Sequence, residues 1–152
     1  MENHSRANAV FAVAVAVAVA VAVSGCSATA PHEPTATDYR AFSDEWVQLM
    51  AKGDRDSGSV DLKSFWSDNK ELVVETADTT CRVTLKAKSR DEALRLVDAS
   101  VAVAQQNGSD RRSALVLVDA SISAAREHIC PQYDNRASQV LAYLATQIAV
   151  EG

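Results

Sequence analysis

The chain contains the segment ALRLVDASV at residues 93–101 and repeats it, with two substitutions, as ALVLVDASI at residues 114–122. The offset of 21 residues equals three heptads, so equivalent residues of the two copies hold the same heptad position, each on its own helix. One interpretation is a duplicated binding element; the other, which the heptad offset favours, is a pair of packed helices with matching seams. The seam residues are Leu94, Val97, Val101 and Ala104 in the first copy, and Leu115, Val118, Ile122 and Ala125 in the second.

Signals for helix ends surround both copies. Ser89 followed by Glu92 is a capping box, which predicts a helix start. Gly108 is typical of the position after a helix, and Pro131 should end the second helix, over about 110–130, because proline has no backbone N–H to donate. The turn at Gly108 joins the two helices into a hairpin. Small alanines on both seams predict a close approach, so we expect this hairpin to form the centre of a bundle.

Helical spacing extends over the rest of the chain from Asp38 onward. Apolar residues three or four apart predict a helix over 38–52 and another over about 61–88, interrupted near 67–69, and a last helix begins near Asp134. The expected inner faces consist of Tyr39, Phe42, Trp46 and Leu49; of Trp66, Val73, Ala77, Cys81 and Leu85; and of Ala137, Leu141, Leu144 and Ile148. No segment has the period of a strand. The sequence therefore predicts an all-α fold, a small bundle of four to five helices.

The N-terminus has the layout of a bacterial lipoprotein signal. Residues 9–23 are all Ala, Val or Phe, and they follow a polar start with one arginine. The next residues complete Val23-Ser24-Gly25-Cys26, which resembles the lipobox, in which the cysteine thiol accepts a diacylglyceryl group. Residues 1–25 are accordingly predicted to be a signal peptide and Cys26 the lipidation site, and the two or three acyl chains would hold the protein at a membrane. Ordinary secretion and a retained transmembrane anchor are the alternatives.

The boundaries that follow from this signal divide the chain into three parts. After residues 1–25, residues 26–37 contain two prolines and small polar residues, which predicts a flexible tether, and residues 38–152 form the helical domain. We expect export and lipid anchoring to the outer face of the cytoplasmic membrane, in the cell envelope. The chain has a net charge of −5, and its overall charge balance is acidic and patternless, so nucleic acid is not an expected partner.

Two cysteines, Cys81 and Cys130, remain in the domain once Cys26 is lipidated. In an exported protein an even pair predicts a disulfide. The alternatives are a reactive thiol or a metal site that also uses His128. Because His128 and Cys130 are two residues apart on a helix, their side chains diverge, so we expect no metal site there. No cofactor is expected either.

Two charged stripes stand out at helical spacing. Arg82, Lys86 and Arg90 form a basic stripe, which has two interpretations: cations near a helix C-terminus, or a contact face for anionic head groups or an acidic envelope polymer. A carboxylate stripe consists of Glu71, Glu75 and Asp78. Paired carboxylates can do acid–base work or bind a hard cation, but with no histidine or glycine loop nearby the expected role is a solvated face.

Sequence motifs of hydrolases and metalloenzymes do not occur in the chain. There is no G-x-S-x-G and no H-E-x-x-H, and His128, as the sole histidine of the domain, has no partner set for nucleophilic catalysis. The sequence therefore predicts a protein without enzymatic activity and with no catalytic residues.

The order of these features resembles a known family. An aromatic helix led by Asp38, a mid-chain cysteine, and an alanine-rich helix that ends in Cys130-Pro131-Gln132-Tyr133 are similar to the small exported two-cysteine helical domain of mycobacteria and their relatives. The resemblance covers roughly residues 38–133 and implies a helical fold and a disulfide, but no activity, because the role of that family is obscure.

We therefore expect a lipid-anchored envelope lipoprotein that acts as a non-enzymatic binding or interaction module, with an envelope protein or polymer as its partner. The alternative is a carrier or sensor of a small apolar ligand, held inside the Ala- and Val-rich bundle.

Overall fold

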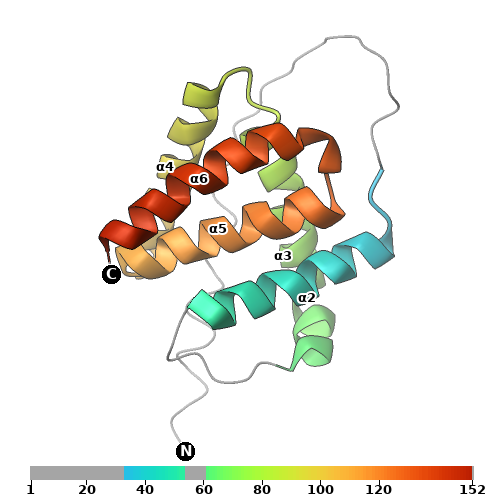
Figure 1. Ribbon diagram of the computed structural model, residues 1–152. Coiled ribbons are helices and arrows are strands. Elements are labelled where there is room, and N and C mark those ends of the chain that lie inside the picture. Colours follow the sequence, from blue (N-terminus) through green and yellow to red (C-terminus); the bar gives the residue numbers. More distant parts are fainter. Residues whose placement is uncertain (1–32, 54–60, 152) are drawn as a thin grey trace, which may run out of the picture.

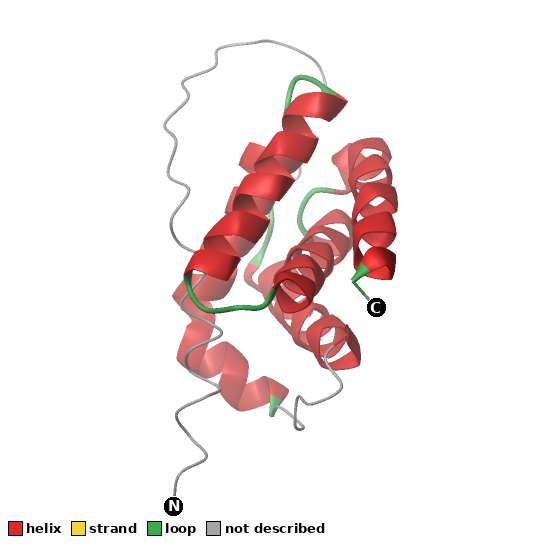
Figure 2. Ribbon diagram, turned by 90° about the vertical axis from the view of Figure 1, so that its left-hand side faces the viewer, coloured by secondary structure: helices red, strands yellow, loops and turns green. Residues whose placement is uncertain are grey.

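The computed structural model describes residues 33–53 and 61–151, and this part of the chain is helical with no strand (Figures 1 and 2). The α-helices are α2 (Ala36–Gly53), α3 (Leu62–Thr79), α4 (Arg90–Gln106), α5 (Arg111–His128) and α6 (Asp134–Val150). Two short elements join them, the π-helix η1 (Thr80–Leu85) and the 3-10 helix η2 (Pro131–Tyr133). The predicted all-α fold with five helices is confirmed. The lipobox and Cys26 lie outside the described residues.

Helix α5 lies at the centre of the bundle, between α2 and α6 in Figure 1, and it also contacts α3, η1, α4 and η2. Of its eighteen residues only Arg111 and Glu127 are exposed. Its buried residues are Ala114, Leu115, Ala120, Ser121, Ile122, Ala124 and Ala125. Four of these seven are alanines, and their small side chains let several helices approach the same axis.

The two copies of the repeated segment are both helical but occupy different environments. Helix α4 packs against α5 as the heptad offset predicts, yet α5 has its most extensive contact with α2. The hairpin is therefore not itself the centre of the bundle; only its second helix is. The burial of equivalent residues shows the difference, since Leu115 is buried while Leu94 is half-buried, and Val97 is buried while Val118 is half-buried.

Polar side chains at the N-termini define where the helices begin. In α2 the hydroxyl of Thr35 accepts a bond from the backbone N–H of Asp38 while the Asp38 carboxylate accepts one from the N–H of Thr35. This reciprocal pair is a capping box, so α2 begins two residues before the predicted boundary at Asp38. Asp61, Ser89 and Asp110 cap α3, α4 and α5, where a side-chain oxygen of each accepts a bond from a backbone N–H of the first turn.

A kink at Asn69 divides α3 and changes which face of the helix is buried. Asn69 has non-helical dihedral angles, φ −125° and ψ 21°, and its amide group donates to the carbonyl of Phe65. The interruption predicted near residues 67–69 is thus present. Trp66 packs against the core, as predicted for a residue of the inner face, but it is only half-buried. Its neighbour Phe65 is buried, because the kink shifts the stripe that leads back from Val73.

Helix α4 ends as Gly108 predicts. Gly108 has a positive φ of 98°, its N–H donates to the carbonyl of Gln105, and the N–H of Ser109 donates to that of Ala104. These two bonds form a Schellman motif, whose left-handed residue is glycine because a Cβ would be strained there. The chain then turns at once into α5.

No helix in the described part is both long enough and apolar enough to cross a membrane.

Candidate functional site

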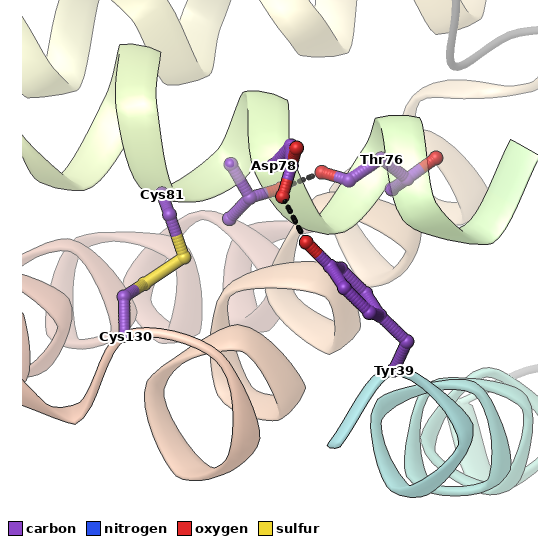
Figure 3. The surroundings of a disulfide bond; sticks show 6 residues. Tyr39, Thr76, Asp78, Cys81 and Cys130 are labelled. Atoms are coloured by element: carbon purple, nitrogen blue, oxygen red, sulfur yellow. Dashed lines mark hydrogen bonds between the residues drawn. A yellow bond between two sulfur atoms is a disulfide. The ribbon is translucent and has the colours of Figure 1, made fainter. Parts of the chain in front are cut away.

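A disulfide joins Cys81 to Cys130, and it fastens η1 to the segment that follows α5 (Figure 3). Both cysteines are buried, and their Cα atoms lie 6.1 Å apart. The predicted pairing is confirmed. It holds the end of the central helix against η1, so both elements keep fixed positions relative to each other.

The element that carries Cys81 is a π-helix, which the sequence did not predict. The N–H of Lys86 donates to the carbonyl of Cys81, five residues earlier, which is the π-helical spacing. Thr80, Cys81, Thr84 and Leu85 are buried, so η1 faces the core with the residues on one side of its wider turn. The α-helix therefore ends at Thr79, and η1 ends at Leu85, three residues before the predicted helix end near residue 88.

The predicted basic stripe is not a stripe on one helix. Arg82 lies in η1, Lys86 follows η1 as its C-cap, and Arg90 is the first residue of α4. All three are nevertheless exposed, and so is Lys88 between them. Residues 82–90, which we call the basic segment, hold four cations and no carboxylate in a chain of net charge −5. Sequence reasoning missed Lys88 because it does not follow the spacing of four.

Arg82 is the one member of the basic segment with an ion-pair partner among the described residues. Its guanidinium donates to Asp78 at 2.9 Å. The other carboxylate oxygen of Asp78 accepts a bond of 2.6 Å from the hydroxyl of Tyr39, and Figure 3 shows this second contact. Burial, the hydrogen bond to Asp78 and the negative charge of Asp78 raise the pKa of Tyr39 to about 12, while Arg82 opposes this shift. Asp78 therefore links α2 to α3.

The other members of the predicted carboxylate stripe remain apart from this contact. Glu71 and Glu75 are exposed on α3, in agreement with a solvated face. Asp78 differs from them because Tyr39 and Arg82 occupy both of its oxygens.

A second group of charged side chains was not foreseen. His128 at the end of α5 places its Nε2 atom 2.6 Å from a carboxylate oxygen of Glu45 on α2. One oxygen of Glu127 joins them, and the three ligand atoms lie within 4.8 Å of one another. Glu45 is 83 residues from His128 in the chain, so no local spacing signals the contact. We call this group the Glu45–Glu127–His128 cluster.

The basic segment, on η1 and the start of α4, and the Glu45–Glu127–His128 cluster, on α2 and α5, are therefore the two candidate sites. No family model matches the chain, and no curated protein and no solved structure matches it either. The resemblance to the exported two-cysteine domain stays a prediction.

Proposed function

We propose that the protein is a lipid-anchored module of the bacterial cell envelope that binds an anionic envelope component through its basic segment. The observation that carries this proposal is the exposure of Arg82, Lys86, Lys88 and Arg90 within nine residues that contain no carboxylate. In an acidic chain such a local reversal of charge attracts anions selectively.

The local structure supports a binding role because it holds the cations in place. The disulfide at Cys81 holds η1, the element that carries Arg82, in place. At the C-terminal end of the basic segment, the side chain of Glu92 accepts a bond of 2.7 Å from the backbone N–H of Lys88, and Ser89 caps α4. Both ends of the basic segment are thus held in place, so its backbone loses little conformational freedom when an anion binds.

Charge reversal of the segment tests the binding proposal. In the variant K86E/K88E/R90E the ion pair of Arg82 with Asp78 remains, so the fold should persist. The full chain in neutral detergent is titrated calorimetrically with inorganic polyphosphate as a soluble anionic polymer. At about 1 kcal/mol for each cation near an anionic surface, the variant should bind about a hundredfold more weakly.

The matched control is K52E/K63E/K70E, which makes the same change in net charge at three exposed lysines on α2 and α3. This control should lose much less affinity, and binding by the unmodified chain should weaken as salt is added. Equal losses in both variants would show that only net charge matters and would contradict a defined binding segment.

The anchor is proposed from the sequence Val23-Ser24-Gly25-Cys26 after an apolar run of fifteen residues. Cells that express the chain are labelled with a palmitate analogue. The unmodified protein should incorporate the label, and Cys26→Ala should not. Continued labelling of Cys26→Ala would rule out this cysteine as the acylated residue.

A further inference from the structure

We propose that the Glu45–Glu127–His128 cluster is a binding site for a divalent transition-metal ion, with Zn²⁺ as the ion of choice. The cluster offers one imidazole nitrogen and two carboxylate oxygens, which are the ligand types that Zn²⁺ takes besides thiolate. A hard ion such as Mg²⁺ prefers oxygen ligands alone, so the imidazole selects against it.

The distances fit a single ion after small side-chain movements. Tetrahedral ligands at Zn–N and Zn–O distances of about 2.0–2.2 Å lie about 3.4 Å from each other. In the cluster the Nε2 atom of His128 is 2.6 Å from Glu45, and the widest separation between ligand atoms is within 4.8 Å. The 2.6 Å contact is shorter than this ligand spacing, so Glu45 must rotate slightly away from His128 before the three atoms surround one ion, and water would be the fourth ligand.

The charges also favour a cation. With a neutral imidazole the cluster carries two negative charges. Within residues 33–53 and 61–151, no lysine or arginine forms an ion pair with Glu45 or Glu127; Arg126, next to Glu127 in the chain, pairs with Asp134 on α6 instead. A bound ion would neutralise both carboxylates and would join α2 to the end of α5.

Glu127 separates a metal site from a simple ion pair. The contact of His128 with Glu45 is sufficient by itself to join α2 to α5, so loss of either residue can weaken the fold. Glu127, however, is exposed and makes no hydrogen bond or ion pair within the described part of the chain. The structural contact between His128 and Glu45 does not involve Glu127. A metal ion, in contrast, would be bound by the Glu127 carboxylate.

The test is a calorimetric titration of the full chain with Zn²⁺. The chain carries Cys26→Ser, which removes a competing thiol, and is first freed of metal with a chelator. We expect saturable binding of one ion and no comparable binding of Mg²⁺. His128→Ala and Glu127→Gln should each weaken Zn²⁺ binding by about tenfold or more, since loss of even an outer-shell partner can cost that much.

Two measurements keep the result unambiguous. Without metal, Glu127→Gln should unfold at the same temperature as its parent, so its weaker binding cannot come from misfolding. Glu71→Gln and His32→Ala, which remove a carboxylate and an imidazole outside the cluster, should bind Zn²⁺ as the parent does. No saturable uptake, equal binding of Mg²⁺, or unchanged binding by Glu127→Gln would each overturn the proposal.

Discussion

Gly53 ends α2 at a point of close approach to α5. A Cβ atom built on Gly53 would overlap with the side chain of Val116. Valine is branched at Cβ and cannot easily turn away. The predicted helix ended at residue 52, but Gly53 is itself helical, and its small size allows the close packing of α2 on α5.

This contact predicts that Gly53→Ala destabilises the protein by about 1–3 kcal/mol through overpacking. Urea unfolding of the full chain measures the loss. Val116→Ala in the same chain should recover part of it, so the two substitutions should be strongly non-additive in a double-mutant cycle. Additive effects would mean that the two side chains do not compete for the same space.

Tyr39 predicts a loss of stability at alkaline pH. Its pKa in the folded protein is raised to about 12 from an ordinary value of 10.0, so folding favours the protonated phenol. The contribution is fully present below pH 10 and is lost as the pH rises from 10 to 12. The free energy of unfolding of Tyr39→Phe should therefore fall less steeply over this range.

The control for this measurement is Tyr133→Phe, at a half-buried tyrosine whose hydroxyl makes no hydrogen bond within the described residues. It should keep the slope of the unmodified protein. If Tyr39→Phe also keeps that slope, the hydrogen bond to Asp78 does not couple folding to the phenol.

Asp119 of α5 predicts a gain in stability on neutralisation. Burial raises the pKa of Asp119 above its ordinary value of 3.8, so the ionised carboxylate weakens the folded state at neutral pH. Asp119→Asn should raise the melting temperature at pH 7, and the gain should shrink as the pH falls toward 3.8.

The repeat provides the control, because Asp98 occupies the equivalent position in the first copy. Asp98 is exposed and accepts a hydrogen bond of 2.8 Å from the hydroxyl of Tyr143 on α6. Asp98→Asn keeps an acceptor oxygen for Tyr143 and should not stabilise the protein. An unchanged melting temperature for Asp119→Asn would show that its carboxylate is well solvated, and a lower one would show that the carboxylate stabilises the fold.

Among the elements, η1 depends most directly on a covalent constraint. It is a single π-helical segment between two α-helices, and the disulfide at Cys81 ties it to the residue after the C-cap of α5. Elements of this kind are uncommon because their backbone geometry is less favourable than that of an α-helix. Packing of Leu85 and the disulfide together offset this cost.

Removal of the disulfide should therefore destabilise the fold considerably. With a sequence separation of 49 residues, loop closure in the unfolded chain accounts for about 4 kcal/mol. Urea unfolding of Cys81→Ala/Cys130→Ala should show a loss of this order. A reductant should cause a similar loss in the unmodified protein and no change in the double variant. If a reductant left the free energy of unfolding of the unmodified protein unchanged, the disulfide would not stabilise the fold as proposed.

At the scale of the whole molecule, the burial of α5 on several sides distinguishes it from α4, although the two share most of a nine-residue sequence. The hydroxyl of Tyr143 on α6 donates a hydrogen bond to Asp98 on α4. Arg111, at the start of α5, forms an ion pair with Glu151, just after α6. Neighbours on several sides thus enclose α5, whereas α4 packs chiefly against α5, α6 and η1.

This asymmetry predicts unequal effects of the same substitution in the two copies. Leu115 is 1% exposed, so Leu115→Ala should cost about 2–5 kcal/mol through loss of burial and the cavity left behind. Leu94→Ala should cost clearly less, because Leu94 is half-buried. The order should reverse at the next seam position, where Val97→Ala should cost more than Val118→Ala. Equal costs within both pairs would mean that the copies are equivalent.

The sequence alone determined the helical class, most helix boundaries and the pairing of the cysteines. These features depend on short-range signals: the spacing of Phe42 and Trp46, the capping box at Ser89, the glycine at 108, and an even number of cysteines in the domain. Local backbone chemistry and residue counting are sufficient to recognise each of them.

Only the tertiary structure decided which helix is central and which charged residues meet. The choice of Phe65 over Trp66 depends on a kink, and the π-helical turn at Cys81 depends on the packing around it. The contact of Glu45 with His128 joins residues 83 positions apart. Such features arise from long-range packing, which places side chains together without leaving any period or motif in the chain.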